Sequence, residues 1–491
     1  MYRAIGSSDR KMINLVCKGH DVAFELSHVV NLFLPYIHEA LTLETLYEHE
    51  KASAYLKASD QTLFEASYEV EKNLDIISHK RKVKQALKKA VYDTLVAYTK
   101  RTMPWGILTG IRPTKIVHEI LRTGISDEKL DGYLEKEYRA SVSKRALMTT
   151  VAKKELAVLQ KNKPGEINVY IGIPFCPTRC VYCSFTAYSL EKSADQVEAY
   201  LAALFKEIEF VASVKKSSPI RSLYIGGGTP TSLNEDQLSR LLKHIKRHFN
   251  LSEIEEYTLE AGRPDTITKE KLWIMKEEGV GRISINPQSM NQKTLDAIGR
   301  KHRVEDIIRV FHEAREVGHT NINMDMILGL PGEDVEDVAN TLKALSKLAP
   351  ENITVHTLAI KRASRLKEKI REHEEEYVLK EGEKIEKMLD LCETQMKALH
   401  LEPYYMYRQK NMLGNFENVG YAKPGTECIY NIEIMEEKES IIALGAGGIS
   451  KLVYENGERL DRVPNVKSLK DYIERIDEMI ERKREGFMKY Q

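Results

Sequence analysis

The sequence predicts an α/β protein built around a parallel sheet, because six short apolar runs alternate with amphipathic helical stretches. The apolar runs are Val169–Ile173, Ser222–Ile225, Tyr257–Glu260, Arg282–Ile285, Asn321–Leu328 and Asn352–Leu358. The helical stretches between them are Asp195–Val214, Glu235–Phe249, Lys269–Glu278, Val304–Val317 and Val335–Leu348. Such βα units have right-handed crossovers and form either an open doubly wound sheet or a partial barrel. Both arrangements place the chemistry at the carboxyl ends of the strands.

The chain is predicted to have three domains. Residues 1–160 are predicted to form a separate α/β domain, which holds the basic helical stretch Arg81–Lys100 and the breaker-rich segment Met103–Lys115. Residues 161–385 contain the βα units, and residues 386–491 form a mixed, partly helical C-terminal domain with a glycine-rich turn at Leu444–Ser450. A length of 491 residues suits two to four domains of roughly 150 residues each.

A three-cysteine motif directly follows the first apolar run. Cys176, Cys180 and Cys183 have the spacing C-x3-C-x2-C. Four thiolates complete the coordination of a four-iron cluster, whereas three leave one iron open to another ligand. Three thiolates are the pattern of radical S-adenosylmethionine (SAM) enzymes, in which SAM chelates the open iron. A structural zinc site normally has two C-x2-C pairs of ligands, and the sequence has no second pair. Three buried thiols are the other alternative. The motif therefore predicts a [4Fe-4S] cluster.

Charge and cysteine usage limit the compartment and the partners. The 74 Lys and Arg residues nearly balance the 73 Asp and Glu residues, so no global field attracts nucleic acid or a membrane. The sequence has no apolar run long enough to span a bilayer. Cys17, Cys392 and Cys428 are scattered and do not suggest a disulfide framework. Because an oxygen-sensitive cluster also requires reducing conditions, we expect a cytoplasmic protein, monomeric, with no nucleic-acid or membrane partner.

Smaller motifs follow the other predicted strands. Gly226-Gly-Gly-Thr-Pro230 follows the second strand, where glycine N–H groups can bind the carboxylate or amine of an amino-acid-like ligand. Glu260 closes the third strand and Gln288 follows the fourth. Asp325 lies inside the apolar fifth strand, where a carboxylate needs a hydrogen-bonding partner. A ribose diol or a basic protein side chain would serve equally well.

Together these motifs resemble the oxygen-independent coproporphyrinogen III oxidase family of radical SAM enzymes. The resemblance covers about Val169 to Lys451 and is carried in order by Tyr170–Cys176, the cysteine loop, Gly226–Thr231, Arg282–Ser289, Ile298–His302, Asp325–Pro331 and Gly445–Ser450. The sequence is most similar to the coproporphyrinogen dehydrogenase (HemZ) branch, because Gly172 precedes the cysteines and because Trp105–Lys115 also looks like that branch.

The resemblance implies a radical SAM partial (β/α)6 barrel with the cluster and SAM in its mouth. Cys176, Cys180 and Cys183 match the cluster ligands of the family. One SAM molecule would contact Tyr170, Gly227, Glu260 and Ile449. The founding type of the family binds a second SAM, and the matching positions are Tyr182, Gly228, Thr229, Gln288, Arg300, Asp325 and Ala359.

The family reaction is an oxidative decarboxylation. One electron from the reduced cluster cleaves SAM to methionine and a 5′-deoxyadenosyl radical, which takes a hydrogen atom from the β-carbon of a propionate. Loss of CO2 and one electron leaves a vinyl group, and two rounds convert coproporphyrinogen III to protoporphyrinogen IX in porphyrin and haem biosynthesis. The resemblance implies a reducing partner such as flavodoxin or ferredoxin. Lys361, Arg362 and Arg365 are candidates for binding the propionates.

Two other functions remain open from the sequence. One is a radical SAM methyltransferase that acts on a tetrapyrrole. The other is a haem-binding chaperone, because Ser184 and Phe185 stand where the founding oxidase carries an extra cysteine, a feature shared with the chaperone relatives. His302, His356 and Cys428 would then be candidate axial ligands.

Overall fold

In a computed structural model, the chain divides into two compact units, Met1–Thr150 and Val151–Gln491. The structure describes residues 2–3, 13–72, 75–110, 112–183, 187–359, 366, 374–408, 416–454, 457 and 459–489. Within these residues, every helix is too short or too polar to cross a bilayer. Helix α5 (Val142–Leu159) spans the division between the two units.

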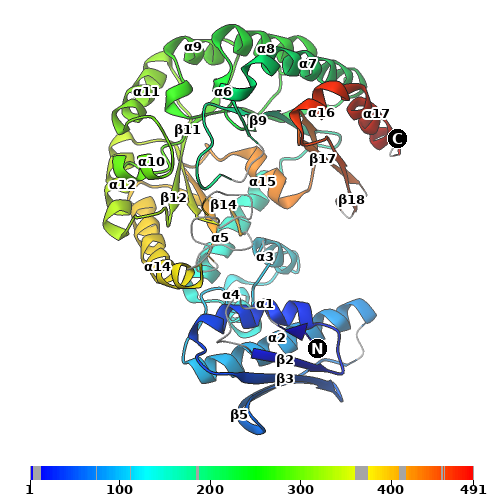
Figure 1. The fold of residues 1–491 in the computed structure, drawn as a ribbon. Coiled ribbons are helices and arrows are strands. Elements are labelled where there is room, and N and C mark those ends of the chain that lie inside the picture. The colour runs from blue at the N-terminus through cyan, green and yellow to red at the C-terminus, as the bar shows by residue number, and fades with distance from the viewer. Residues whose placement is uncertain are drawn as a thin grey trace. The chain divides into compact units, whose positions relative to one another are not determined.

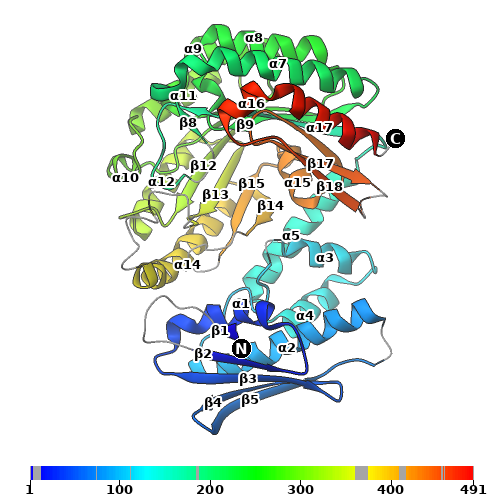
Figure 2. The same cartoon turned by 45° about the vertical axis from the view of Figure 1, so that its right-hand side comes forward.

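The first unit is a small α/β fold. Its sheet has the order β1-β2-β3-β4-β5, in which β2 and β3 run parallel and the other neighbours run antiparallel. Helices α1 and α2 cover one face of this sheet (Figure 2). The elements are β1 (Tyr2–Arg3), β2 (Ile13–Lys18), α1 (Ala23–Phe33), β3 (Leu41–Glu48), β4 (Lys51–Ala58), β5 (Gln61–Glu69), α2 (Ile76–Thr99), α3 (Thr114–Leu121) and α4 (Asp127–Tyr138).

The second unit contains six parallel strands that neighbour one another in chain order. They are β6 (Ile167–Ile173), β9 (Ile220–Gly227), β10 (Glu256–Gly262), β11 (Arg282–Ile285), β12 (Ile322–Leu328) and β13 (Asn352–Thr357). Nearly all their side chains are buried, because a parallel sheet with covered faces uses continuous apolar runs instead of alternating ones. The six predicted strands are confirmed to within two residues at each end.

Helices form an outer layer around these strands (Figure 1). The helices are α7 (Val197–Val214), α8 (Glu235–His248), α9 (Lys269–Glu277), α11 (Val304–Val317), α12 (Val335–Leu348) and α14 (Glu374–Ala398). Short helices α6 (Leu190–Ser193) and α10 (Gln292–Ala297) lie in the connections. The curved parallel sheet inside the helical arc is the predicted partial barrel.

The C-terminal part extends this sheet at both edges. β15 (Asn418–Ala422) pairs antiparallel with β13 and carries β14 (Glu402–Tyr407). At the opposite edge β16 (Ser440–Leu444) pairs parallel with β6, followed by β17 (Ile449–Tyr454) and β18 (Arg459–Pro464). Helices α15 (Ile429–Glu436), α16 (Leu469–Glu474) and α17 (Ile476–Met488) complete the unit. One sheet of 11 strands results.

Candidate functional site

The three clustered cysteines lie in the loop that follows β6. Within the described residues none of the three forms a disulfide; Cys180 is buried, and Cys176 and Cys183 are half-buried. Burial raises the pKa of the Cys176 thiol to about 11; the Thr229 hydroxyl opposes this rise, and Cys183 and Cys180 add to it. The three sulfur atoms are therefore close enough to interact electrostatically in one poorly solvated space. The Cys176 thiol therefore stays protonated until a metal displaces its proton.

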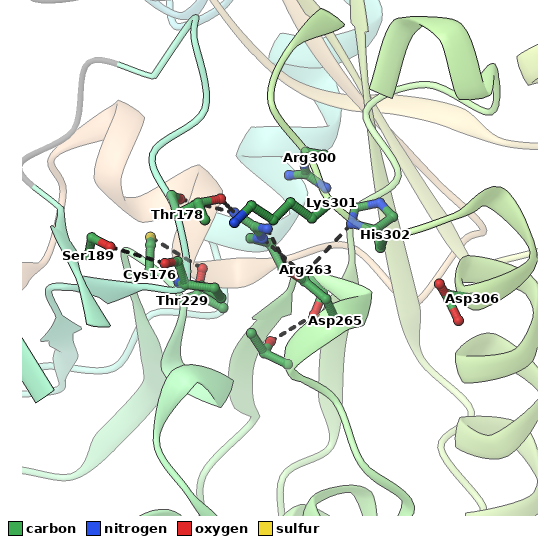
Figure 3. Close-up of polar contacts among 12 residues, drawn as sticks. Cys176, Thr178, Ser189, Thr229, Arg263, Asp265, Arg300, Lys301, His302 and Asp306 are labelled. Atoms are coloured by element: carbon green, nitrogen blue, oxygen red, sulfur yellow. Dashed lines mark hydrogen bonds and ion pairs between the residues drawn. The ribbon is translucent and has the colours of Figure 1, made fainter. Parts of the chain in front are cut away.

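A glycine turn at the end of β9 supports the cysteine loop. The Gly228 amide donates to the Ile173 carbonyl at 2.8 Å, and the Thr229 amide donates to the Phe175 carbonyl at 2.8 Å. The Thr229 hydroxyl lies 3.4 Å from the Cys176 sulfur (Figure 3). A Cβ atom at Gly228 would lie 2.6 Å from the Phe175 oxygen and 3.0 Å from that sulfur. Only glycine lets the two loops pack this closely.

Arg263, which directly follows β10, holds the same loop from the other side (Figure 3). Its Nη1 donates to the carbonyl and hydroxyl oxygens of Thr178 at 3.0 and 2.8 Å. A bidentate pair with Asp265, at 3.0 and 2.6 Å, fixes the guanidinium group. His302 Nδ1 lies 3.7 Å from Asp265, so the three side chains lie in a short row. Arg263 is only 3 % exposed, which makes it a rigid support for the cysteine loop.

Arg300 is a second buried cation beside the cysteines. It is 5 % exposed and donates to the Asn286 carbonyl. Burial by itself lowers the pKa of Arg300, but Tyr182 and Cys180 raise it above its usual range. Its Nε atom is buried and has no hydrogen-bond partner among the described residues. A buried guanidinium with a spare donor is suited to an anionic ligand.

Gln288, which follows β11, and Asp325, in the middle of β12, lie side by side. Gln288 has a left-handed backbone with φ of 66°, its amide donates to the Asp325 carbonyl at 2.9 Å, and its buried Oε1 has no partner within the described structure. The Asp325 carboxylate accepts from Asn323 at 2.7 Å and lies 3.7 Å from His356. Burial raises the pKa of Asp325, but His356 and then Asn323 more than offset this effect, so the net pKa is lowered. Strain and an orphaned acceptor at one position suggest a ligand site.

Glu260 lies at the end of β10 beside a layer of stacked tyrosines. Its Oε1 accepts from the Tyr224 hydroxyl at 2.5 Å. Burial raises the pKa of Glu260 to about 7; the Tyr224 hydrogen bond opposes this rise and Asp325 adds to it. The Tyr224 ring stacks on Tyr430 at 4.5 Å, and Tyr170 stacks on Tyr430 at 5.8 Å. The carboxyl group therefore lies against an aromatic layer that keeps water away from it.

The remaining predicted residues lie at the same edge of the sheet. Gly227, with φ of 113°, ends β9, and Ala359 follows β13 directly after Leu358. The Gly445 turn follows β16 beside β6, where a Cβ atom would lie 2.5 Å from the Gly172 oxygen. Ile449 begins β17 after this turn, and 42 % of its surface is exposed. Their contacts with SAM stay predictions.

The structure does not place every predicted residue at this site. Lys361, Arg362, Arg365, Ser184 and Phe185 are outside the described residues. Trp105–Lys115 belongs to the first unit, and its Ile111 is not described. Among the candidate axial ligands, Cys428 is fully buried and donates to Glu256 at 3.3 Å.

Arg263, Thr178 and Asn286 were not predicted from the sequence. Asn286 accepts from Arg300 through its carbonyl oxygen and from the Asp325 amide through Oδ1 at 3.2 Å, so it joins two predicted positions. The available signal was position, because Asn286 directly follows the fourth predicted strand and Arg263 comes three residues after the third.

Comparison with known proteins gives consistent results. The sequence profile of the Radical SAM superfamily matches residues 170–345. The chain is 41 % identical to the "Oxygen-independent coproporphyrinogen-III oxidase-like protein HemZ" of Bacillus subtilis over 408 residues, which cover 82 % of this chain and 81 % of that protein. It is 32 % identical to the "Heme chaperone HemW" of B. subtilis, over 63 % of this chain and 76 % of that one.

The fold is similar to a solved structure. The coproporphyrinogen III oxidase HemN of Escherichia coli aligns with a TM-score of 0.51 at 24 % identity, over 67 % of this chain and 73 % of that chain. This likeness concerns the fold. The sequence identity to the HemZ protein over four-fifths of both chains is the stronger finding. The chain therefore belongs to the radical SAM superfamily, in the family of HemZ-like, oxygen-independent coproporphyrinogen III oxidase-like proteins.

Proposed function

We propose that the protein is an oxygen-independent coproporphyrinogen III oxidase that converts two propionate side chains of coproporphyrinogen III to vinyl groups. The observation that carries this proposal is the three-cysteine loop packed on a glycine turn at the carboxyl ends of β6 and β9, in a chain with a HemZ-like sequence. Radical SAM family membership implies a [4Fe-4S] cluster and SAM. The name of the HemZ relative supports a tetrapyrrole substrate.

Cys176, Cys180 and Cys183 would hold the cluster. The site fits such a group because Cys183 and Cys180 interact electrostatically with the shielded Cys176 thiol, and because Gly228 leaves space beside the Cys176 sulfur. The described residues around the loop contain no fourth cysteine, since Cys392 and Cys428 belong to other elements. Three thiolate ligands leave one iron for the amine and carboxylate of SAM.

SAM would lie against the polar groups at the strand ends. Tyr170, Gly227, Glu260 and Ile449 are proposed to contact the SAM on the cluster, and Tyr182, Gly228, Thr229, Gln288, Arg300, Asp325 and Ala359 to contact a second one. The orphaned Gln288 Oε1 and Arg300 Nε support a polar ligand at the second position. When bound, the cluster and SAM supply a carbon-centred radical that can remove a hydrogen atom from a propionate β-carbon.

The chain's own side chains position and shield these groups. Glu260 can accept a hydrogen bond from an ammonium group when ionised, and a nearby positive charge lowers the pKa of a carboxyl group. The Arg300 guanidinium can bind a carboxylate, and Asn286 fixes its orientation. The tyrosine layer beside Glu260 presents aromatic surface that limits water in the barrel. Buried, fixed donors of this kind suit the orientation of a reactive molecule.

A haem-chaperone function is the second candidate, because the HemW protein is 32 % identical to this chain. Of its proposed axial ligands, Cys428 is fully buried and donates a hydrogen bond to Glu256 at 3.3 Å, which haem ligation would break. His302 and His356 each lie 3.7 Å from a carboxylate, and these two separations do not exclude haem ligation. The oxidase is the better supported proposal because the identity to the HemZ protein is 41 % over 82 % of this chain.

Anaerobic turnover tests the proposal. The cluster-reconstituted protein is incubated with SAM, dithionite and coproporphyrinogen III, and the products are read by mass spectrometry. Loss of one and then two carboxyl groups, with methionine and 5′-deoxyadenosine, is the expected result. Cys180→Ala is expected to lose both SAM cleavage and decarboxylation. Cys392→Ala, in helix α14, is expected to keep both. A methylated product would identify a methyltransferase, and stable haem binding without SAM cleavage would identify a chaperone.

A further inference from the structure

A group of three potential metal ligands lies on the outer helical layer of the second unit, away from the strand ends. His244 and His248 stand one turn apart on α8, and Glu209 faces them from α7. One ligand atom from each residue lies within 4.8 Å of the others. Residues four apart on a helix share a face, so both imidazoles can reach one ion.

The His244 ring is fixed in an orientation suited to metal binding. It stacks on Phe205 with ring centroids 4.3 Å apart, and 14 % of the side chain is exposed. The backbone of Phe205 hydrogen-bonds the ring, whereas Nε2 is buried and, among the described residues, has no hydrogen-bond partner. The Phe205 contact therefore uses Nδ1, and in the neutral ring the lone pair lies on Nε2. Protein zinc sites often fix the tautomer of a ligating histidine in this way.

An ordinary ion pair does not explain this arrangement. His244 Nε2 lies 3.4 Å from the Glu209 carboxylate, which is beyond good hydrogen-bonding distance. The ring centroids of His244 and His248 are only 4.4 Å apart, so two charged imidazoles would repel each other. Burial lowers the pKa of His244, and His248 lowers it further. A cation between the three groups satisfies the orphaned lone pair and the carboxylate together.

We propose that Glu209, His244 and His248 form a binding site for a divalent transition metal of the Zn²⁺ class. Two imidazole nitrogens and one carboxylate oxygen suit Zn²⁺, Co²⁺ or Ni²⁺, whereas Mg²⁺ and Ca²⁺ prefer oxygen ligands. Water completes the coordination, because Glu209 is exposed and the site opens to solvent. The ion joins α7 to α8 and stabilises the packing of these two barrel helices.

The test measures metal content in full-length, tag-free protein. Cluster thiols also bind Zn²⁺, so the starting protein carries Cys176→Ala, Cys180→Ala and Cys183→Ala. After dialysis against micromolar Zn²⁺, mass spectrometry is expected to find one bound equivalent, and Co²⁺ is expected to give a visible spectrum of nitrogen and oxygen ligands without thiolate bands. In wild-type protein with a reconstituted cluster, the same equivalent of Zn²⁺ is expected alongside the iron.

Variants locate the ion. His244→Ala and His248→Ala are expected to lose the bound equivalent, and Glu209→Gln to weaken binding about tenfold or more. His312→Ala, an exposed histidine on α11, is the matched control and is expected to bind normally. Zn²⁺ is expected to raise the melting temperature of the control but not of His244→Ala. Absence of bound Zn²⁺ in the starting protein, or full retention in the His244→Ala/His248→Ala variant, would overturn the proposal.

Discussion

Gly228 packs against the Phe175 carbonyl and the Cys176 sulfur, where the glycine turn meets the cysteine loop. Gly228 has no positive φ, so its backbone does not require glycine, and the requirement comes only from space. A Cβ atom there would lie 2.6 Å from the Phe175 oxygen and 3.0 Å from the sulfur. Since the backbone oxygen cannot rotate away, a methyl group has to push the two loops apart.

We therefore expect Gly228→Ala to separate the cysteine loop from the turn. Overpacking of this kind costs about 1–3 kcal/mol, and iron retention after reconstitution is expected to fall with it. Gly132, exposed on α4 with no atom within 4 Å of its would-be Cβ, is the matched control, and Gly132→Ala should stabilise the helix slightly. Iron assay and urea unfolding measure both effects. Full iron retention in Gly228→Ala would contradict this account.

The buried Glu260 carboxyl is expected to make the stability of the cluster-free protein depend on pH. Burial raises its pKa from the ordinary 4.5 to about 7, so the folded protein binds a proton more tightly than the unfolded chain does. Stability is then highest below about pH 4.5 and falls as pH rises through about 7, by about 3 kcal/mol in total.

Glu260→Gln removes this titration, and the variant is expected to gain stability over the wild type between pH 5 and pH 8. Urea unfolding of both proteins at the two pH values measures the difference. Other buried carboxyls, such as Glu439, whose pKa burial also raises to about 7, titrate in both proteins and cancel. An identical loss of stability in both proteins would show that Glu260 does not carry the effect.

At the scale of elements, the strand ends that meet the cysteine loop are held by charged side chains. Arg263 connects the end of β10 to Thr178 in the loop, and Asp265 fixes its guanidinium. Burial alone raises the pKa of Asp265, but His302 and Arg263 lower it well below its usual range. The carboxylate therefore stays charged and keeps Arg263 in place.

Arg263→Ala is expected to release the Thr178 segment and to lower iron retention and SAM cleavage. Because the change also leaves Asp265 as an unpaired charge, Arg263→Ala/Asp265→Ala separates folding from support of the loop. The double variant should recover stability but not iron retention. Arg240→Ala, which breaks only exposed pairs on α8, is the control. Normal iron retention in the double variant would show that the loop holds its shape without Arg263.

The six strands and five helices of the barrel could be predicted because each is a local pattern. Strands buried on both faces give continuous apolar runs, and covering helices give a 3.6-residue period. β16 could not be placed, because nothing local in Ser440–Leu444 indicates pairing with β6, which lies far earlier in the chain. Likewise, Gln288 and Asp325 were found from strand position, whereas the backbone link between them depends on the fold.

At the scale of the second unit, the end of the chain supports the site through a buried charge network. Lys483 on α17 lies 2.7 Å from Glu207 on α7, and both side chains are fully buried. Glu207 also accepts from the Gly445 amide at 2.8 Å, from Tyr472 at 2.5 Å and from Asn465 at 2.8 Å. The same carboxylate thus joins the last helix to the turn that packs on Gly172, just before the cysteine loop.

Lys483→Met is expected to destabilise the second unit by about 3 kcal/mol, because Glu207 keeps a buried charge without its cation. Glu207→Gln/Lys483→Met should recover much of this loss, since both charges are then gone. Lys470→Met, which breaks an exposed pair with Glu474, is the control and should cost under about 1 kcal/mol. Urea unfolding measures stability, and the KM for SAM reports on the Gly445 turn. A raised KM for SAM in the double variant, despite recovered stability, would show that the network positions the Gly445 turn. An unchanged KM would show that the network only holds α17 in place.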